Sequence, residues 1–337
     1  LKLIIPVTNG QDFLGGRAVY VQWAGLSDPD DFYTDPVAKQ IYKDHVFTIL
    51  NRVNTYTGIA YKDDPTIMAW EATNEAFMTV DTPAEASGTP LRDWYREMAI
   101  YIKSLDSNHL VGTGEIGFDV DAVGFSTLGN DWILRGQGDT GSSYKANIAI
   151  PEIDFASVHI YPETLGYTAT EANQLIADYA SLARSHGKPL YLGEYGMESD
   201  RWVYQQWLAT VDQEDAAGSL LWQFLPESHG REWAPDVMYP TDTALVSMLS
   251  THSIVMNAKS GPPDPNPPSV AITNPLSGQT VTSSGLQVTG TASDDNTVAL
   301  VRVRANSGAW TLASGYDLWE AAVVLTAAGS NLIEAQS

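Results

Sequence analysis

Short apolar runs alternate with longer amphipathic stretches over the first three quarters of the chain. The apolar runs lie at 1–7, 66–72, 109–114, 154–160, 189–194 and 218–224. Between them, apolar residues recur every three or four positions, as on one face of a helix. Strands that are apolar almost throughout and alternate with helices predict a parallel sheet covered by helices.

The amphipathic stretches carry start and stop signals of helices. Helices are expected at 36–56, from Thr89-Pro90 onward, at 171–186, after Asp200, and at 243–256. Thr89 is the predicted N-cap of the second helix, with Pro90 in its first turn. In the first helix, the predicted buried face holds Val46, Ile49, Leu50 and Val53, and Gly58 is the predicted stop.

Polar side chains gather where the predicted strands end. They are Asn74, Glu75, Glu115, His159, Tyr161 and Glu194. The carboxyl ends of parallel strands share the face of a barrel that carries its active site. The predicted fold class is therefore α/β, a (β/α)8 barrel. Because six strands are visible and a closed barrel has eight, the first two strand–helix units are expected to precede residue 1.

The pattern changes after residue 258. Residues 259–268 form a proline-rich stretch, which indicates an extended, semi-rigid linker. Beyond it, short β-rich runs separated by Gly, Asn, Asp and Ser predict a small immunoglobulin-like β-sandwich at 269–337, which ends in mid-strand. We therefore expect a catalytic domain at 1–258, a linker and a truncated sandwich.

The amino-acid composition limits which classes of partner and cofactor are expected. The 337 residues carry a formal net charge of −23, so neither nucleic acid nor a membrane is an expected partner. The chain has no cysteine, which excludes disulfides and cysteine-ligated metals. No metal-binding constellation or cofactor motif is evident, so neither a metal nor a cofactor is expected.

Glu75 and Glu194 each close an apolar run, TIMAWEATNE and KPLYLGE. Two carboxyl groups held in this way suit the hydrolysis of a glycosidic bond. One protonates the leaving oxygen, and the other attacks the sugar or guides water. A lone glutamate would indicate a surface or ion-paired residue, but the pair beside Asn74 favours a catalytic site.

Residues 1–258 resemble glycoside hydrolase family 5, in its endo-β-1,4-mannanase branch. The resemblance is carried by the stretch from FYTDPVAKQ to AWEATNE, and by IDFASVHIYPE, LGEYG and LLWQF. The tail resembles, more weakly, the immunoglobulin-like modules of secreted bacterial glycanases. The resemblance implies a secreted bacterial enzyme that acts as a monomer on β-mannan and manno-oligosaccharides.

The resemblance also implies roles for single residues. Glu75 matches the general acid/base, Glu194 the nucleophile, and Asn74 the residue that hydrogen-bonds the sugar 2-hydroxyl. The other matches line the sugar site: His159 and Tyr161 orient the carboxylates, and Trp222 forms an aromatic platform. Glu115 is predicted to line a subsite, with a structural ion pair as the equal alternative.

Other positions carry weaker expectations. Trp70 is expected in the core, whereas Trp132, Trp202 and Trp233 lie in loops as distal sugar platforms or as anchors. The family has an arginine at the end of its second barrel strand that has no counterpart here, since Arg17 lies in a predicted loop. Where Gly10-Gln11 stands, the mannanases tend to have an aromatic residue.

Two alternatives to mannan hydrolysis stay open from the sequence. The first is the same site acting on β-1,4-glucan or a mixed glycan, or exo-acting on mannobiose. The second is a glycan-binding protein that has lost catalysis, against which the full set of site residues argues.

Overall fold

The computed structural model describes residues 2–12, 14–121, 123–126, 140–232, 234–259, 268–294, 298, 301–308, 310–315, 317–326 and 328–336. The chain divides into two compact units, Leu1–Asp242 and Thr243–Ser337. All the candidate site residues lie in the first unit. Trp132, Trp233 and most of the expected linker lie outside the described residues.

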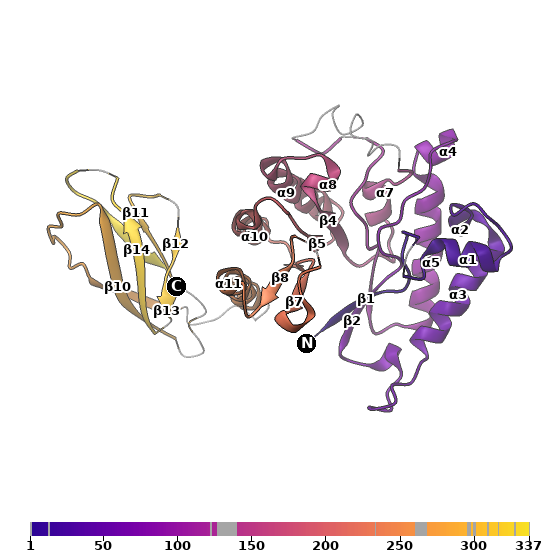
Figure 1. The fold of residues 1–337 in the computed structure, drawn as a ribbon, viewed down its shortest axis with the longest axis horizontal. Coiled ribbons are helices and arrows are strands. Elements are labelled where there is room, and N and C mark those ends of the chain that lie inside the picture. Colours follow the sequence, from indigo (N-terminus) through magenta and orange to yellow (C-terminus); the bar gives the residue numbers. More distant parts are fainter. Residues whose placement is uncertain are drawn as a thin grey trace. The chain divides into compact units, whose positions relative to one another are not determined.

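A parallel sheet runs through the first unit (Figure 1). Its strands follow in chain order: β1 (Leu3–Pro6), β2 (Ile67–Glu71), β3 (Leu110–Gly112), β4 (Ala156–Ile160), β5 (Leu190–Tyr195) and β6 (Gly218–Ser219). A parallel bridge between Gly112 and Phe155 joins β3 to the chain that enters β4. A further parallel pair consists of β7 (Phe224–Pro226) and β8 (Val237–Tyr239). This order of parallel strands and helices is that of a (β/α)8 barrel, as predicted.

Helices cover the outer side of this sheet. They are α1 (Arg17–Trp23), α2 (Asp31–Thr34), α3 (Pro36–Leu50), α4 (Pro83–Ala86), α5 (Thr89–Leu105), α7 (Tyr144–Ile148), α8 (Pro162–Leu165), α9 (Ala169–Ser185) and α10 (Tyr204–Gln213), with short 3-10 turns η1 (Tyr61–Asp63), η2 (Arg201–Val203) and η3 (Glu227–His229). In Figure 1, α3 and α5 lie beyond β1 and β2, and α9 lies beside β4 and β5. No helix in the described part of the chain is long and apolar enough to cross a bilayer.

Buried rings fill the space between α1, α2, α3 and α5. Phe32, Tyr42 and Trp94 are all 1% exposed or less, and the Phe32 and Trp94 ring centroids are 5.3 Å apart. A second, smaller cluster on the other face of the strands joins Ala69, Phe155 and Tyr191. The sheet therefore has apolar contacts on both faces, which explains why its strands are apolar almost throughout.

Two helix boundaries differ from the prediction. α3 ends at Leu50, because the following residues form a turn of their own in which the Asn54 side chain accepts from the Tyr56 N–H at 2.9 Å. Val53 is consequently exposed rather than on the buried face of the helix. The N-cap of α5 is Gly88, with a φ of 70°, and Thr89 is the first helical residue.

Two further predictions change in the structure. Arg17 is not in a loop but begins α1, where it is buried and pairs with Asp30. The run at 218–224 is not one strand but two, β6 and β7, with Trp222 between them. The predicted cap at Asp200 is confirmed, since its side chain accepts from the Trp202 N–H at 2.9 Å.

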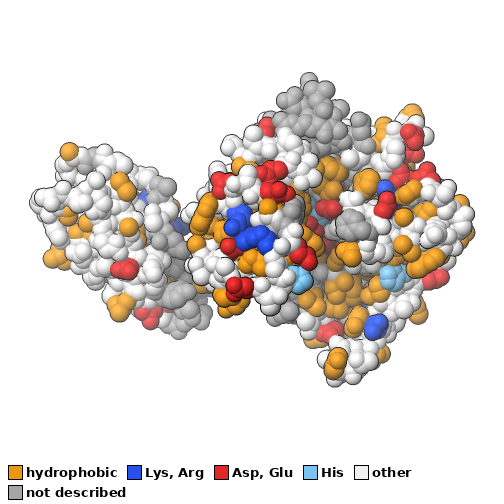
Figure 2. All heavy atoms as spheres, viewed as in Figure 1, with side chains coloured by type: hydrophobic (Ala, Val, Ile, Leu, Met, Phe, Trp, Pro, Cys, Tyr) orange, Lys and Arg blue, Asp and Glu red, His pale blue; other side chains and the backbone are white. Residues whose placement is uncertain are grey.

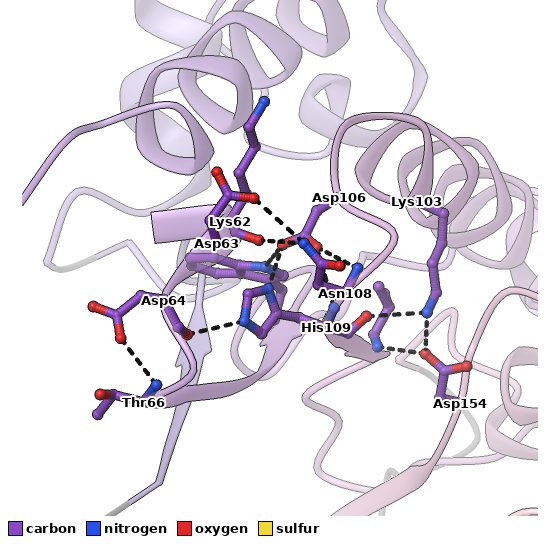
Figure 3. Close-up of polar contacts among 11 residues, drawn as sticks. Lys62, Asp63, Asp64, Thr66, Lys103, Asp106, Asn108, His109 and Asp154 are labelled. Atoms are coloured by element: carbon purple, nitrogen blue, oxygen red, sulfur yellow. Dashed lines mark hydrogen bonds and ion pairs between the residues drawn. The ribbon is translucent and has the colours of Figure 1, made fainter. Parts of the chain in front are cut away.

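A hydrogen-bonded cluster ties the start of β2 to the start of β3 (Figure 3). Trp70 is fully buried, as predicted, and donates from Nε1 to Asp106 Oδ2 at 2.7 Å. His109 Nδ1 lies 2.6 Å from the same oxygen, and its Nε2 lies 3.1 Å from the Asp64 carbonyl oxygen. Burial raises the pKa of Asp106, but its hydrogen bonds outweigh burial and hold the pKa below its ordinary value.

A cavity of about 510 Å³ borders this cluster, lined by residues such as Lys2, Pro65, Met68 and His109. It lies at the amino ends of the strands, whereas barrel active sites lie at the carboxyl ends. The cluster and the cavity therefore belong to the support of the fold, and the candidate chemistry lies at the other end of the strands.

The second unit begins with α11 (Thr243–Lys259) and continues as two antiparallel sheets. One sheet has the order β13-β14-β10-β9, and the other β12-β11-β15. Their bounds are β9 (Ser269–Asn274), β10 (Gly285–Ser293), β11 (Arg302–Ala305), β12 (Thr311–Leu312), β13 (Ser314–Gly315), β14 (Leu318–Val324) and β15 (Ile333–Gln336). Val288, Val303 and Trp319 form part of its core. The predicted β-sandwich is confirmed, and its sequence boundaries stay a prediction.

The surface reflects the net charge of −23. In the view of Figure 2, acidic side chains are scattered over the first unit, and Lys and Arg side chains form one small group and otherwise stand singly. This distribution offers no extended basic face in that view, which a polyanionic partner would require.

Candidate active site

The two glutamates meet above the carboxyl ends of β2 and β5. Glu194 lies in β5, where it pairs in register with His159 of β4. Glu75 follows the end of β2 after a short loop. A carboxylate oxygen of each glutamate and a ring nitrogen of His159 all lie within 4.8 Å of one another. The fold thus brings together three residues that are far apart along the chain.

His159 bridges the two carboxyl groups. Its Nδ1 lies 2.8 Å from Glu75 Oε1 and 3.6 Å from Glu194 Oε2. From the far side, the Tyr161 hydroxyl donates to Glu194 Oε2 at 2.6 Å. Each glutamate side chain is 17% exposed, whereas His159 is 2% exposed. The carboxyl groups are therefore open to a ligand, with the imidazole buried behind them.

Burial and neighbouring charges shift the pKa values of Glu194 and His159. Burial raises the pKa of Glu194, as does the negative charge of Glu75, and His159 and the Tyr161 hydroxyl oppose this only in part. For His159, burial lowers the pKa, but its hydrogen bond to Glu75 and the charges of the nearby glutamates outweigh burial, so the net shift is upward. Both shifts favour the protonated forms of these two groups.

The backbone at Glu75 is in the left-handed region, with a φ of 51°. This is a costly conformation for a residue with a side chain, and the neighbouring strands hold it there. The Glu75 N–H donates to the Gly114 carbonyl at 2.7 Å, and the Gly10 N–H donates to the Asn74 carbonyl at 2.6 Å. A Cβ on Gly10 would lie 2.4 Å from the Glu75 carbonyl oxygen, so the close approach requires glycine.

Sequence comparison identifies this fold. Residues 4–223 match the model of the glycoside hydrolase family 5 β-mannosidase-like proteins, and residues 268–335 match that of the bacterial Ig domain. The chain belongs to glycoside hydrolase family 5. The family resemblance predicted from the sequence is thereby confirmed, as is the immunoglobulin-like tail.

Named relatives agree with this assignment. Putative mannan endo-1,4-β-mannosidase 4 of Arabidopsis thaliana is 35% identical over 281 residues, which cover 75% of this chain and 67% of the relative. Mannan endo-1,4-β-mannosidase 1 of the same plant is 47% identical over 164 residues, 49% of this chain and 38% of the relative. This family 5 chain therefore spans between 38% and 67% of the length of these two relatives.

Solved structures confirm the barrel. The endo-1,4-β-D-mannanase from Thermotoga petrophila RKU-1 superposes with a TM-score of 0.68 at 33% identity, covering 75% of each chain. The endo-1,4-β-mannanase from Rhizomucor miehei has a TM-score of 0.68 at 31% identity, covering 77% of this chain and 72% of that one.

Three of the remaining predicted sugar contacts are at least partly exposed. Asn74 is half-buried, and its Nδ2 lies 3.5 Å from Asn9 Oδ1. Trp222 is 44% exposed, so its ring is open to a ligand. Trp202, on η2, is 59% exposed. All three are accessible enough to contact a sugar, and their roles stay predictions.

Glu115 does not fit either sequence interpretation. It is 1% exposed, which argues against the predicted sugar contact, and it forms no ion pair with a described residue. Burial raises its pKa to about 8, with hydrogen bonding from Asn147 opposing and the charge of Asp119 reinforcing this shift. Its burial away from the two glutamates leads us to assign Glu115 to the fold.

Gln11 is a site residue whose role the sequence did not reveal. Its Nε2 donates to Glu75 Oε2 at 3.3 Å. The only sequence signal was that the mannanases tend to have an aromatic residue here. Gln11 therefore places an amide donor beside Glu75, at a position where the mannanases tend to have a ring.

Replacing Gln11 with alanine should move the alkaline limb of the kcat/KM profile upward by roughly half a pH unit, because the hydrogen bond that the Gln11 amide donates to Glu75 is lost. Steady-state kinetics on galactomannan from pH 4 to 10 would measure the shift. Gln22→Ala, an exposed position in α1, is the control. An unchanged alkaline limb in the Gln11 variant would show that this hydrogen bond is unimportant.

The Glu75, His159 and Glu194 group is also the one set of described residues placed closely enough to hold a metal ion. A cation there would occupy both carboxylates and His159 Nδ1, the atoms that proton transfer requires. The existing hydrogen bonds from His159 and Tyr161 already partner these oxygens. The same contacts suit proton transfer among these groups.

Proposed function

We propose that this chain hydrolyses internal β-1,4-mannosidic bonds of mannan, galactomannan or glucomannan with retention of configuration. The observation that carries the proposal is the closeness of the two carboxyl groups, whose oxygens approach within 4.8 Å. Retaining glycosidases hold the two groups about 5–5.5 Å apart, whereas inverting ones leave about 6.5–9.5 Å for a water molecule. The spacing favours direct attack by a carboxylate.

In the first step, the Glu194 carboxylate attacks the anomeric carbon of the mannosyl unit. Glu75 gives its proton to the glycosidic oxygen, so the carbon–oxygen bond breaks and the leaving sugar departs as an alcohol. The product is a glycosyl ester on Glu194. The Tyr161 hydroxyl, 2.6 Å from Glu194 Oε2, holds this carboxylate in position for attack.

In the second step, Glu75 acts as a base. It takes a proton from water, and the water oxygen attacks the same carbon as the bond to Glu194 breaks. Both carboxyl groups return to their starting states, and two inversions leave the configuration unchanged. His159, in contact with both groups, orients them through both steps.

The substrate assignment is supported by the relatives, which are named mannan endo-1,4-β-mannosidases. The exposed Trp222 ring suits stacking on the apolar face of a sugar, and Asn74 suits the 2-hydroxyl contact. We further propose that the enzyme is an extracellular bacterial monomer, and that the Ig module acts as a spacer or weak glycan-binding module.

A polysaccharide panel tests the proposal. The chain should release manno-oligosaccharides from galactomannan and glucomannan, with a rapid fall in viscosity that marks internal cleavage. Proton NMR of fresh products should show the β-anomer first. Release of sugar from carboxymethylcellulose but not from galactomannan would contradict the substrate, and an initial α-anomer would contradict retention.

A further inference from the structure

A third carboxyl group lies directly below the catalytic pair. Glu71 is the last residue of β2 and is 6% exposed. Side chains alternate along a strand, so Glu71 shares its face with Ala69, whose cluster with Phe155 and Tyr191 lies inside the sheet. Trp70 and Ala72 belong to the core cluster on the opposite face. Glu71 therefore points into the barrel interior.

The same alternation places its neighbours. On β4, Ser157 stands between Phe155 and His159, and on β5, Gly193 follows Tyr191 by two positions; a register shift after Val158 then brings Glu194 beside His159. Gly193 leaves room for the imidazole, since a Cβ there would lie 3.1 Å from His159 Nε2. Glu71, Ser157 and Gly193 thus form the layer beneath the catalytic residues. Such layers are usually apolar, so a carboxyl group here calls for a reason.

Glu71 packs against the backbone that supports Glu75. A Cβ built on Gly114 would lie 3.2 Å from the Glu71 Cβ, and the Gly114 N–H donates to Ser157 Oγ at 3.1 Å. Gly114 is also the residue whose carbonyl holds Glu75. Glu71 Oε1 has no hydrogen-bond partner among the described residues. The Glu71 side chain is therefore packed against Gly114, the residue that holds Glu75, and its Oε1 atom is available for a further hydrogen bond.

We propose that Glu71 is a positioning residue of the proposed glycosidase site: it supports His159 from below and, once ionised, holds protons on the Glu75–His159–Glu194 group. The proposal rests on the proposed function for its kinetic consequences. Its geometric basis is the interior layer that Glu71 shares with Ser157 beneath His159.

Burial and the charged groups around Glu71 determine the pH range in which it is ionised. Burial raises its pKa to about 7, with the charge of Glu194 reinforcing and His159 and the Ser157 hydroxyl opposing the shift. Two phenols also face it, Tyr191 of β5 and Tyr95 of α5, and burial raises the pKa of each above its ordinary value. Glu71 thus changes charge near neutral pH while both phenols stay neutral.

The sign of the effect follows from these charges. Below about pH 7 Glu71 is neutral and adds nothing to the field at the site. Above that pH, its negative charge favours the protonated form of His159. His159 therefore keeps its proton, and with it the contact of its Nδ1 with Glu75 Oε1, to higher pH, and the alkaline limb of activity is extended. The acid limb lies where Glu71 is neutral and is unaffected.

Glu71→Gln is the decisive variant, because the amide keeps the size of the side chain and removes its charge. The alkaline limb of kcat/KM on galactomannan should move down by about one pH unit, with the acid limb unchanged. Ser157→Ala removes the hydroxyl that favours ionised Glu71, so it should shift the same limb in the same direction by less. Asp178→Asn, a buried carboxyl of α9 bonded to Ser126, is the matched control.

NMR titration of the His159 ring nitrogens separates this proposal from the proposed function. In Glu71→Gln, His159 should lose its proton at lower pH than in the parent chain, whether or not either protein cleaves mannan. An unchanged titration together with an unchanged alkaline limb would overturn the role of Glu71. A uniform loss of activity at all pH values would also overturn it, because that result indicates a structural role alone. A parent chain inactive on every glycan would instead count against the proposed function.

Discussion

Replacing Glu194 with alanine is expected to lower kcat/KM on galactomannan by about 10⁴-fold or more, the scale of loss when a nucleophile is removed. No other described carboxyl group is placed to take over, since Glu75 lies on the leaving-group side and Glu71 is buried beneath the pair. Initial rates with purified variants measure the effect. Glu320→Ala, an exposed glutamate of β14, is the control and should leave the rate unchanged.

Azide should restore turnover in the Glu194→Ala variant. The missing side chain leaves space for a small anion beside the anomeric carbon, and Glu75 still protonates the leaving group. A single displacement then gives the α-mannosyl azide, which NMR distinguishes from the β-anomer. Full activity without azide, or a β-azide product, would show that another residue is the nucleophile.

Replacing Glu75 with alanine should have the second largest effect, a fall of about 10²–10⁴-fold on polysaccharide, the usual contribution of a positioned acid. The loss should depend on the leaving group. An aryl mannoside with an acidic phenol needs no protonation, so its first step should persist and give a burst of phenol before slow turnover. Stopped-flow absorbance would measure the burst and the rate that follows.

In this variant azide attacks the glycosyl ester on Glu194, so the product should be the β-mannosyl azide. The two alanine variants are therefore each other's controls, because they should yield opposite anomers. If the anomers were exchanged between the variants, the roles of Glu75 and Glu194 would have to be exchanged as well.

Local pattern was sufficient to predict the frame of the site. Glu75, His159 and Glu194 each follow an apolar run, and parallel strands carry such residues to one face of the sheet. The register that pairs His159 with Glu194 follows from the same topology. Helix interiors were predictable for a similar reason, since Leu91, Trp94 and Met98 recur at helical spacing and are buried.

The rest depended on contacts between distant segments. Glu71 lies within an apolar run, and the sequence did not indicate it as a site residue. Its role follows only from its place on the inward face of β2, below His159. Glu115 follows a strand like the catalytic residues, yet its loop turns it inward. The hydrogen bond from Gln11 to Glu75 joins residues 64 positions apart, and no local signal announces it.

The left-handed backbone at Glu75 has a consequence for how mutations will distribute over the gene. Glu75, the proposed acid/base, is held by two glycines, Gly10 and Gly114, that carry no reactive atom. A methyl group on Gly114 would lie 2.2 Å from the Thr73 carbonyl oxygen, and one on Gly10 would press on Glu75 itself. Selection on activity will therefore constrain these positions as strictly as the carboxylates, and an inactive natural variant can arise with its two catalytic acids intact.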